Sequence, residues 1–112
     1  MGKMMIIATD SIGSSNHALG TVLMTSFFMN LAEASEIPRS IHFLNEGVHL
    51  TCENSKVLDF IRCLEMRGAA ITTCRTCLEY LDIEKDLRIG SVGTMFETVA
   101  DLMSADDTIV IA

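Results

Sequence analysis

Tryptophan is absent from this 112-residue chain, and tyrosine and proline each occur once, as Tyr80 and Pro38. Basic residues are also few: 8 Lys and Arg stand against 15 Asp and Glu, and the formal net charge is −7. An acidic surface repels phosphate groups, so this composition argues against direct binding to nucleic acid and disfavours anionic lipid. A basic protein partner remains compatible with it.

Long apolar runs are also missing. No run approaches the ~18 residues that a membrane-spanning helix needs. The first run stops at Thr9 and Asp10, which makes it too short for the core of a signal peptide. We therefore expect a cytoplasmic chain without a membrane segment. In that compartment its four cysteines suggest thiol chemistry or metal binding more than structural disulfides.

Length and apolar content predict a single domain over residues 1–112 with a sizeable core, since 49% of the residues are hydrophobic. Short apolar runs predict strands at 4–9, 40–44, 69–73, 87–89 and 108–111, and longer periodic segments predict helices at 17–34, 54–67, 77–83 and 94–103. This regular alternation predicts an α/β fold, in which a parallel sheet carries helices on both faces.

Two of the predicted helices carry apolar residues at helical spacing. In the helix at 17–34 they recur every four residues, at Leu19, Leu23, Phe27 and Leu31, and this predicts a broad buried face, widened by Val22, Met24, Phe28 and Met29. The same surplus of apolar side chains also suits a subunit interface. In the last helix we expect Met95, Val99 and Leu102 to point inward.

Ligands of parallel sheets bind beyond the carboxyl ends of the strands, so the loops at that edge are the candidate site. Their candidate binding residues are Asp10, Ser11, Asn45, Gly47, Arg75, Gly90, Ser91 and Gly93. We expect Gly47 to adopt a positive φ in its turn. The segment 90–93 has the composition of a flexible turn before a helix, where backbone amides can hold an anion, although it matches neither a dinucleotide fingerprint nor a P-loop.

Cys74 and Cys77 are the strongest candidates for chemistry. Cys74 ends a β-branched run, and Cys77 opens a predicted helix, so both lie at the carboxyl edge of the sheet. A helix start and the neighbouring Arg75 both favour an ionised thiol. Such a pair could carry sulfur as a persulfide, form a disulfide, bind a metal, or simply pack as small apolar residues. Zinc needs two more ligands and no second C-x-x-C exists, so we expect no metal and no cofactor.

Several short motifs occur in an order and spacing typical of one family. They include Asp10-Ser11 with Gly13, Leu19-Gly20 with Leu23-Met24, Pro38, the segment 43–48, the segment 74–80, Gly90-Ser91-Val92, and Met95. In these motifs nearly the whole chain resembles the DsrE-like family of small sulfur-handling proteins. Within that family it is most similar to the YedF-like members, which are associated with selenium metabolism.

The resemblance implies a three-layer α/β/α domain with a five-stranded parallel sheet, usually assembled as a homo-oligomer. It also implies that Cys74 accepts sulfur as a persulfide, that Cys77 is the second cysteine of some members, and that a TusA-like sulfur-carrier protein or domain is the partner. Two positions depart from the family pattern, because Arg75 and Asp82 stand where glycine is usual.

Three hypotheses follow. The first is a carrier of sulfur, or of selenium, with Cys74 as the persulfide-bearing nucleophile, Cys77 as the resolving thiol, and Asp10, Asn45 and segment 90–93 shaping the pocket. The second is a dithiol–disulfide redox protein. Thioredoxin-like proteins, however, place C-x-x-C early and face it with a later proline, whereas Pro38 precedes the motif here. The third is a non-catalytic ligand-binding or assembly module. Whether the chain is an enzyme stays open at this stage.

Overall fold

The fold is built on one parallel sheet of five strands. The computed structural model describes residues 2–112, and its strands are β1 (Lys3–Ile7), β2 (Ser40–Phe43), β3 (Ala70–Cys74), β4 (Ser91–Gly93) and β5 (Asp107–Ile111). They lie in the order β4-β3-β2-β1-β5, and every neighbouring pair is parallel. The predicted α/β class with a five-stranded parallel sheet is therefore confirmed.

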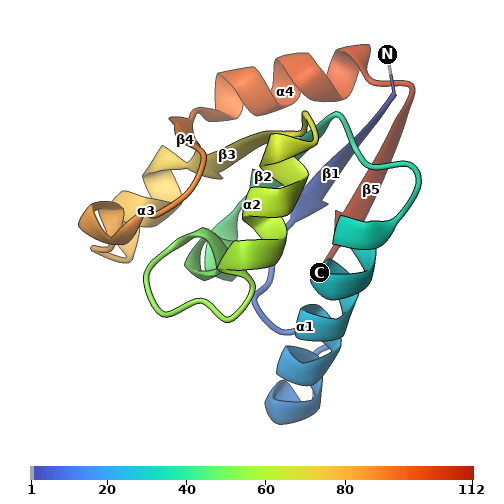
Figure 1. The fold of residues 1–112 in the computed structure, drawn as a ribbon. Coiled ribbons are helices and arrows are strands. Elements are labelled where there is room, and N and C mark those ends of the chain that lie inside the picture. The colour runs from blue at the N-terminus through green and yellow to red at the C-terminus, as the bar shows by residue number, and fades with distance from the viewer. Residues whose placement is uncertain (1) are drawn as a thin grey trace.

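Helices cover both faces of this sheet. They are α1 (His17–Glu33), α2 (Leu58–Met66), α3 (Arg75–Tyr80) and α4 (Met95–Ser104), with short 3-10 helices η1 (Asn45–Thr51) and η2 (Glu84–Asp86). Phe43 of β2 stacks on Phe28 of α1, whereas its neighbour His42 bonds to Asp101 of α4. Successive residues of a strand point to opposite faces. Helices α1 and α2 therefore lie on one face and α4 on the other, as Figure 1 shows.

The main core lies between the sheet and the α1–α2 layer. Its fully buried side chains include Ile7, Phe28, Ile41, Phe43, Ile61 and Leu64. Each such side chain contributes roughly 1.5–3 kcal/mol through removal from water. This core fixes β1, β2 and β3 and with them the loops that follow their carboxyl ends.

Helix α1 has the predicted length, but a different side of it is buried. Gly20, Met24, Phe28 and Ala32 face inward, whereas Leu19 and Leu23 of the predicted stripe are 53% and 45% exposed. The cause is the close approach of α1 to the preceding loop, where a Cβ on Gly20 would lie 2.1 Å from Ser11 Oγ. The side of α1 that carries Gly20 therefore turns inward with Met24 and Phe28 of the predicted stripe, and Leu19 and Leu23 are left outside.

The fourth strand is displaced from its predicted position. Residues 87–89 do not join the sheet, and Leu87 forms only an isolated antiparallel bridge with Cys52. The turn is at Gly90, which has φ +77° and packs against the Ile71 carbonyl. The strand follows it as Ser91–Gly93, with Gly93 beside Cys74. The prediction of a flexible turn over 90–93 is therefore wrong for three of its four residues.

Two further local predictions are wrong. The positive φ in the loop after β2 belongs to Asn45, at +51°, and not to Gly47. Gly47 is required for space instead, because a Cβ there would lie 2.3 Å from the Ile7 carbonyl oxygen. In α4, Met95 and Val99 point outward, being 55% and 46% exposed, and Thr98 is the buried residue. Polar groups on β2 and β3 face α4, so the polar side of α4 turns inward.

Candidate functional site

The two thiols of the C-x-x-C segment lie where β3 passes into α3. Cys74 is the last residue of β3 and the N-cap of α3, which begins at Arg75. The predicted helix start at Cys77 was two residues late, so Cys77 lies within the first turn. The strand end is anchored by the buried Thr73, whose hydroxyl contacts that of Thr51 in η1 at 2.8 Å. This contact fixes η1, which follows β2, relative to the end of β3, from which α3 begins.

The environments of the two thiols differ. Cys74 is only 8% exposed, whereas Cys77 is partly exposed, and its Sγ accepts a hydrogen bond from the Asn45 N–H at 3.1 Å. Burial and a hydrogen bond from the Cys74 side chain raise the pKa of Cys77, and the Asn45 N–H opposes this shift. Both thiols are reduced and lie three residues apart at the junction of β3 and α3. Burial and the neighbouring Cys74 side chain both favour the protonated form of Cys77.

A small cavity opens beside Cys77. Its volume is about 240 Å³, and its lining residues are Asn45, Glu46, Thr76, Cys77, Tyr80 and Leu81. Glu46 on its wall bonds to His49, with 3.0 Å between Oε1 and Nε2. The cavity combines residues of η1 and α3, two segments that follow neighbouring strands. A molecule entering it meets Cys77 and not Cys74, because only Cys77 contributes to its lining.

Asp10 and Ser11 lie away from this cavity. Asp10 lines a separate one of about 360 Å³ with His17, His49, Glu53 and Lys56 among its neighbours. Ser11 is buried, and its hydroxyl donates to the His17 carbonyl at 2.8 Å. The Ser11 side chain therefore holds the loop against the start of α1.

The candidate binding residues Arg75 and Ser91 lie outside the cavity beside Cys77. Arg75 lines a cavity of about 200 Å³ with Glu79, Glu84 and Val92, apart from the cavity beside Cys77. Ser91 is exposed on the edge strand. At the start of α4 the Glu97 N–H donates to Thr94 Oγ1, and the Glu97 carboxylate accepts from the Thr94 N–H. This reciprocal capping uses amides that an anion would otherwise bind.

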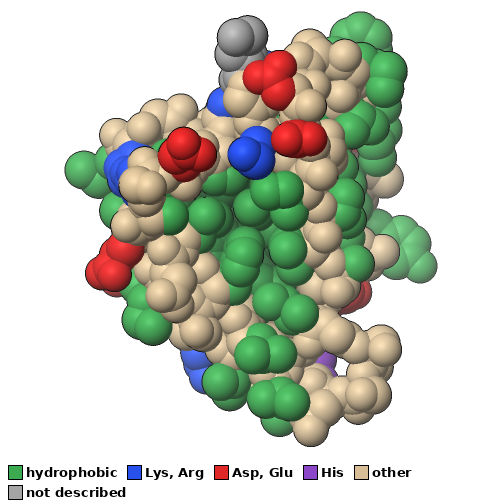
Figure 2. Space-filling model, turned by 90° about the vertical axis from the view of Figure 1, so that its right-hand side faces the viewer, with side chains coloured by type: hydrophobic (Ala, Val, Ile, Leu, Met, Phe, Trp, Pro, Cys, Tyr) green, Lys and Arg blue, Asp and Glu red, His purple; other side chains and the backbone are tan. Residues whose placement is uncertain are grey.

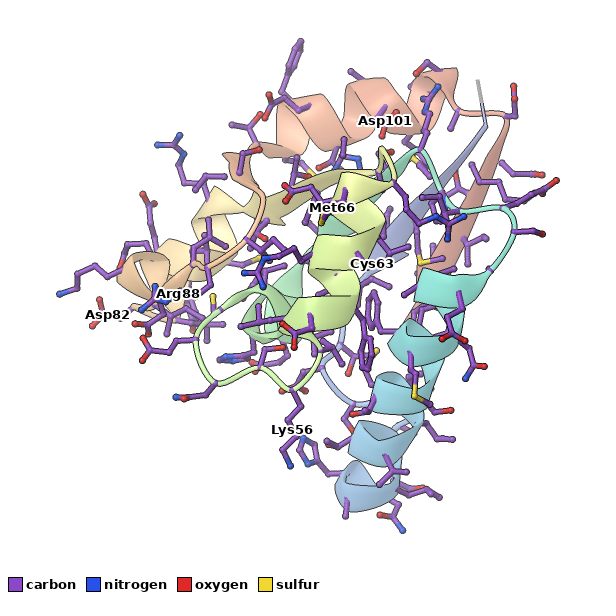
Figure 3. The ribbon with its side chains drawn as sticks, viewed as in Figure 1. Lys56, Cys63, Met66, Asp82, Arg88 and Asp101 are labelled. Carbon is purple, nitrogen blue, oxygen red and sulfur yellow. The ribbon has the colours of Figure 1, made fainter. Side chains whose placement is uncertain are left out.

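A partly buried polar network between β2 and α4 was not predicted from the sequence. Asp101, labelled in Figure 3, accepts hydrogen bonds from Arg39 and Ser40, and its Oδ2 lies 2.7 Å from His42 Nε2. His42 Nδ1 in turn contacts Thr72 Oγ1 at 2.8 Å. The sequence carried two signals for it: polar residues alternate with apolar ones in β2, and an aspartate interrupts the apolar pattern of α4.

The network sets the charge of Asp101. Burial alone would raise its pKa, but the hydrogen bonds from His42, Ser40 and Arg39 outweigh that effect and lower the pKa to about 2. The carboxylate is therefore ionised at neutral pH and attaches α4 to the sheet.

Within residues 2–112, no group of three or more His, Cys, Asp or Glu side chains is placed to hold a metal ion. None of the helices described is long and apolar enough to cross a membrane.

Comparison with known proteins gives matches in structure alone. No family model and no curated protein matches the chain. The ychN protein of E. coli superposes with a TM-score of 0.66 and 18% identity, over 99% of this chain and 100% of that chain. Two proteins of unknown function are also similar. MTH1491 of Methanobacterium thermoautotrophicum has a TM-score of 0.66 and 17% identity, over 96% of each chain. BT1422 of Bacteroides thetaiotaomicron has a TM-score of 0.63 and 18% identity, over 98% and 95%.

At these identities the likeness shows a shared fold. The superposition extends over 95–100% of the length of each neighbour.

Proposed function

We propose that this protein is a DsrE-like sulfur carrier, which accepts a sulfur atom as a persulfide on the Cys74–Cys77 pair and passes it to a partner such as a TusA-like carrier. The observation that carries the proposal is the pair of reduced thiols at the carboxyl edge of the sheet, one of which opens on a cavity. The motif order in the sequence and the fold shared with the structural neighbours support it.

The chemistry needs only thiols. A cysteine thiolate of the chain attacks the outer sulfur of a persulfide R–S–SH, and R–S⁻ leaves, so the chain gains one sulfur atom without net oxidation. An acceptor thiolate then takes the outer sulfur and restores the cysteine. Alternatively, the second thiol of the pair attacks the inner sulfur. This attack forms the Cys74–Cys77 disulfide and releases HS⁻, and two external thiols must then reduce the disulfide.

Intact-mass spectrometry after incubation with glutathione persulfide tests this function. The wild type should gain roughly 32 Da per chain, the mass of one sulfur atom, in a form that a thiol reductant removes. The Cys74→Ser/Cys77→Ser double variant should gain nothing, and Cys63→Ser should behave as the wild type. Sulfur gain that persists in the double variant, or a wild type that neither gains sulfur nor releases HS⁻ as the Cys74–Cys77 disulfide forms, would refute the carrier.

One observation favours a second candidate, a dithiol–disulfide redox protein. Both thiols are reduced and lie three residues apart, Cys74 at the N-cap of α3 and Cys77 in its first turn, and such proximity is what a reversible disulfide requires. A redox protein would lose roughly 2 Da on oxidation by glutathione disulfide and gain no sulfur from glutathione persulfide. The same mass spectra therefore separate the two functions.

A further inference from the structure

We infer that Cys77, and not Cys74, is the thiol that receives the incoming sulfur, and that Cys74 is the resolving thiol behind it. This inference rests on the proposed function and reverses the order implied by family resemblance. Its first support is accessibility: Cys74 is 8% exposed, whereas Cys77 is partly exposed and lines the cavity of about 240 Å³. A persulfide in that cavity contacts the Cys77 sulfur first.

The second support is the backbone amide of Asn45. It donates to Cys77 Sγ at 3.1 Å, and a hydrogen bond of this kind becomes stronger when the sulfur is ionised. The amide is held in place by the positive φ of Asn45 and by the close packing of Gly47 on the Ile7 carbonyl. The fold therefore provides a fixed donor for a Cys77 thiolate. No corresponding hydrogen bond to the Cys74 sulfur from a backbone amide is found among residues 2–112.

The steps then follow in a fixed order. The Cys77 thiolate attacks the outer sulfur of R–S–SH, R–S⁻ leaves, and Cys77–S–SH forms in the cavity. An acceptor thiolate can remove the outer sulfur directly. Otherwise the Cys74 thiolate attacks the inner sulfur from within the protein, HS⁻ leaves through the cavity, and a Cys74–Cys77 disulfide remains for two external thiols to reduce.

Single-cysteine variants distinguish this order from the reverse. With glutathione persulfide, Cys74→Ala should gain one sulfur at the wild-type initial rate or faster and retain it, because no resolving thiol remains. In Cys77→Ala the initial rate should fall by about tenfold or more, since the remaining thiol is buried. Cys63→Ala is the matched control, and thermal unfolding of each variant shows that it is folded.

The outcomes are distinct. If Cys77→Ala takes up sulfur as fast as Cys74→Ala or faster, Cys77 is not the receiving thiol. The protein would still be a sulfur carrier, with the roles of the two cysteines reversed. If the wild type itself takes up no sulfur, the proposed function fails together with the order.

A second inference comes from the outer side of α1. Leu19 and Leu23 are exposed in its row of apolar residues, and the half-buried Phe27 and Leu31 continue that row. Leu23, Phe27 and Leu31 line a groove of about 500 Å³ together with Ser26 and Asn30. Figure 2 shows apolar side chains gathered across this side of the molecule, with the charged ones mostly along its upper rim. From Ala18 to Ala32 the helix contains no charged residue, in a chain that is 21% charged. Apolar surfaces of this kind are covered in working proteins.

The family resemblance already implies a homo-oligomer, and we propose that this side of α1 is the surface at which the second copy binds. Each copy carries a charge of −7, so two copies repel one another over most of their surfaces. The uncharged side of α1 is a place where they can meet without that repulsion.

The helix surface also suits pairing with itself. A row of residues spaced by four forms a ridge, and the row through Ser26 and Asn30 forms a groove beside it. Ridges of this type pack into the grooves of an identical helix at about −50°. A two-fold axis would place the ridge of each copy in the groove of the other.

Sedimentation velocity tests this pairing. The wild type should sediment as a dimer or a higher even-numbered assembly at micromolar concentration, and Leu23→Asp and Val22→Asp should sediment as monomers with unchanged circular dichroism. Val22 is 64% exposed, so its substitution does not disturb the core. Met66→Asp, at an 82% exposed position on α2, is the control and should associate as the wild type. A monomeric wild type, or association unaffected by both α1 substitutions, would overturn the proposal.

Discussion

At the scale of single residues, burial and the neighbouring Cys74 side chain predict a raised pKa for the Cys77 thiol. Burial and the Cys74 side chain raise the pKa of Cys77, so its alkylation by iodoacetamide should reach half-maximal rate above the ordinary value of ~8.5. Removing the neighbouring thiol in Cys74→Ala should lower that midpoint, and Cys63→Ala should leave it unchanged. Peptide mapping of the alkylated protein at a series of pH values measures both. An unchanged midpoint in Cys74→Ala would show that the thiols do not interact.

A second residue-scale prediction concerns Asp101. Its pKa in the folded protein is about 2, below the ordinary 3.8, so the ionised carboxylate stabilises the folded state at neutral pH. That contribution is complete above pH ~4 and is lost as pH falls through ~2. We expect Asp101→Asn to lower the free energy of unfolding by about 2 kcal/mol at pH 7, and the difference should shrink towards pH 2. Urea unfolding at several pH values measures it.

Asp107→Asn is the control for this series. Asp107 is exposed at the start of β5, and no hydrogen bond to its side chain is found within residues 2–112. Its substitution should change stability by less than about 0.5 kcal/mol. Equal stability of Asp101→Asn and wild type at pH 7 would contradict the role of Asp101 in attaching α4.

At the scale of elements, the position of η1 depends on Gly47. A Cβ at this residue would lie 2.3 Å from a backbone oxygen of β1, which cannot move as a side chain could. Gly47→Ala should therefore lower the free energy of unfolding by about 2 kcal/mol or more. Gly13→Ala is the comparison, since Gly13 has φ +92° with open space around it, and strain alone should cost about 1 kcal/mol. Thermal or urea unfolding ranks the two, and a smaller cost at Gly47 would contradict this account.

Most of the secondary-structure elements could be predicted from the sequence. Apolar runs located four of the five strands, and their alternation with helices predicted the parallel sheet. The fourth strand was misplaced because an edge strand of three residues needs little apolar sequence. The buried side of α1 was missed because the helix is apolar on several sides, and the space required at Gly20 decides its rotation. That requirement comes from a contact with the preceding loop, which no local pattern contains.

The candidate site was predictable to a similar extent. The spacing of Cys74 and Cys77 and the end of a strand were enough to place both thiols at the carboxyl edge, and Asn45 was placed beside them by topology. Glu46 and Tyr80, which line the cavity, were not singled out, because their approach depends on how η1 and α3 pack. The difference in burial between the two thiols was also invisible in the sequence, and that difference decides the order of the proposed steps.

At the scale of the whole molecule, the net charge should control association through α1. Two copies bring together a total charge of about −14, and this repulsion is screened as the Debye length falls from about 10 Å at 0.1 M salt to about 3 Å at 1 M. The contact itself is uncharged and loses nothing by screening. Association of the wild type should therefore tighten as NaCl rises, the opposite of an interface held by ion pairs. Sedimentation at the two salt concentrations measures it, with Met66→Asp expected to follow the wild type and Leu23→Asp expected to stay monomeric. Weaker association at high salt would show that charged groups hold the copies together, and the pairing surface would then have to be sought away from α1.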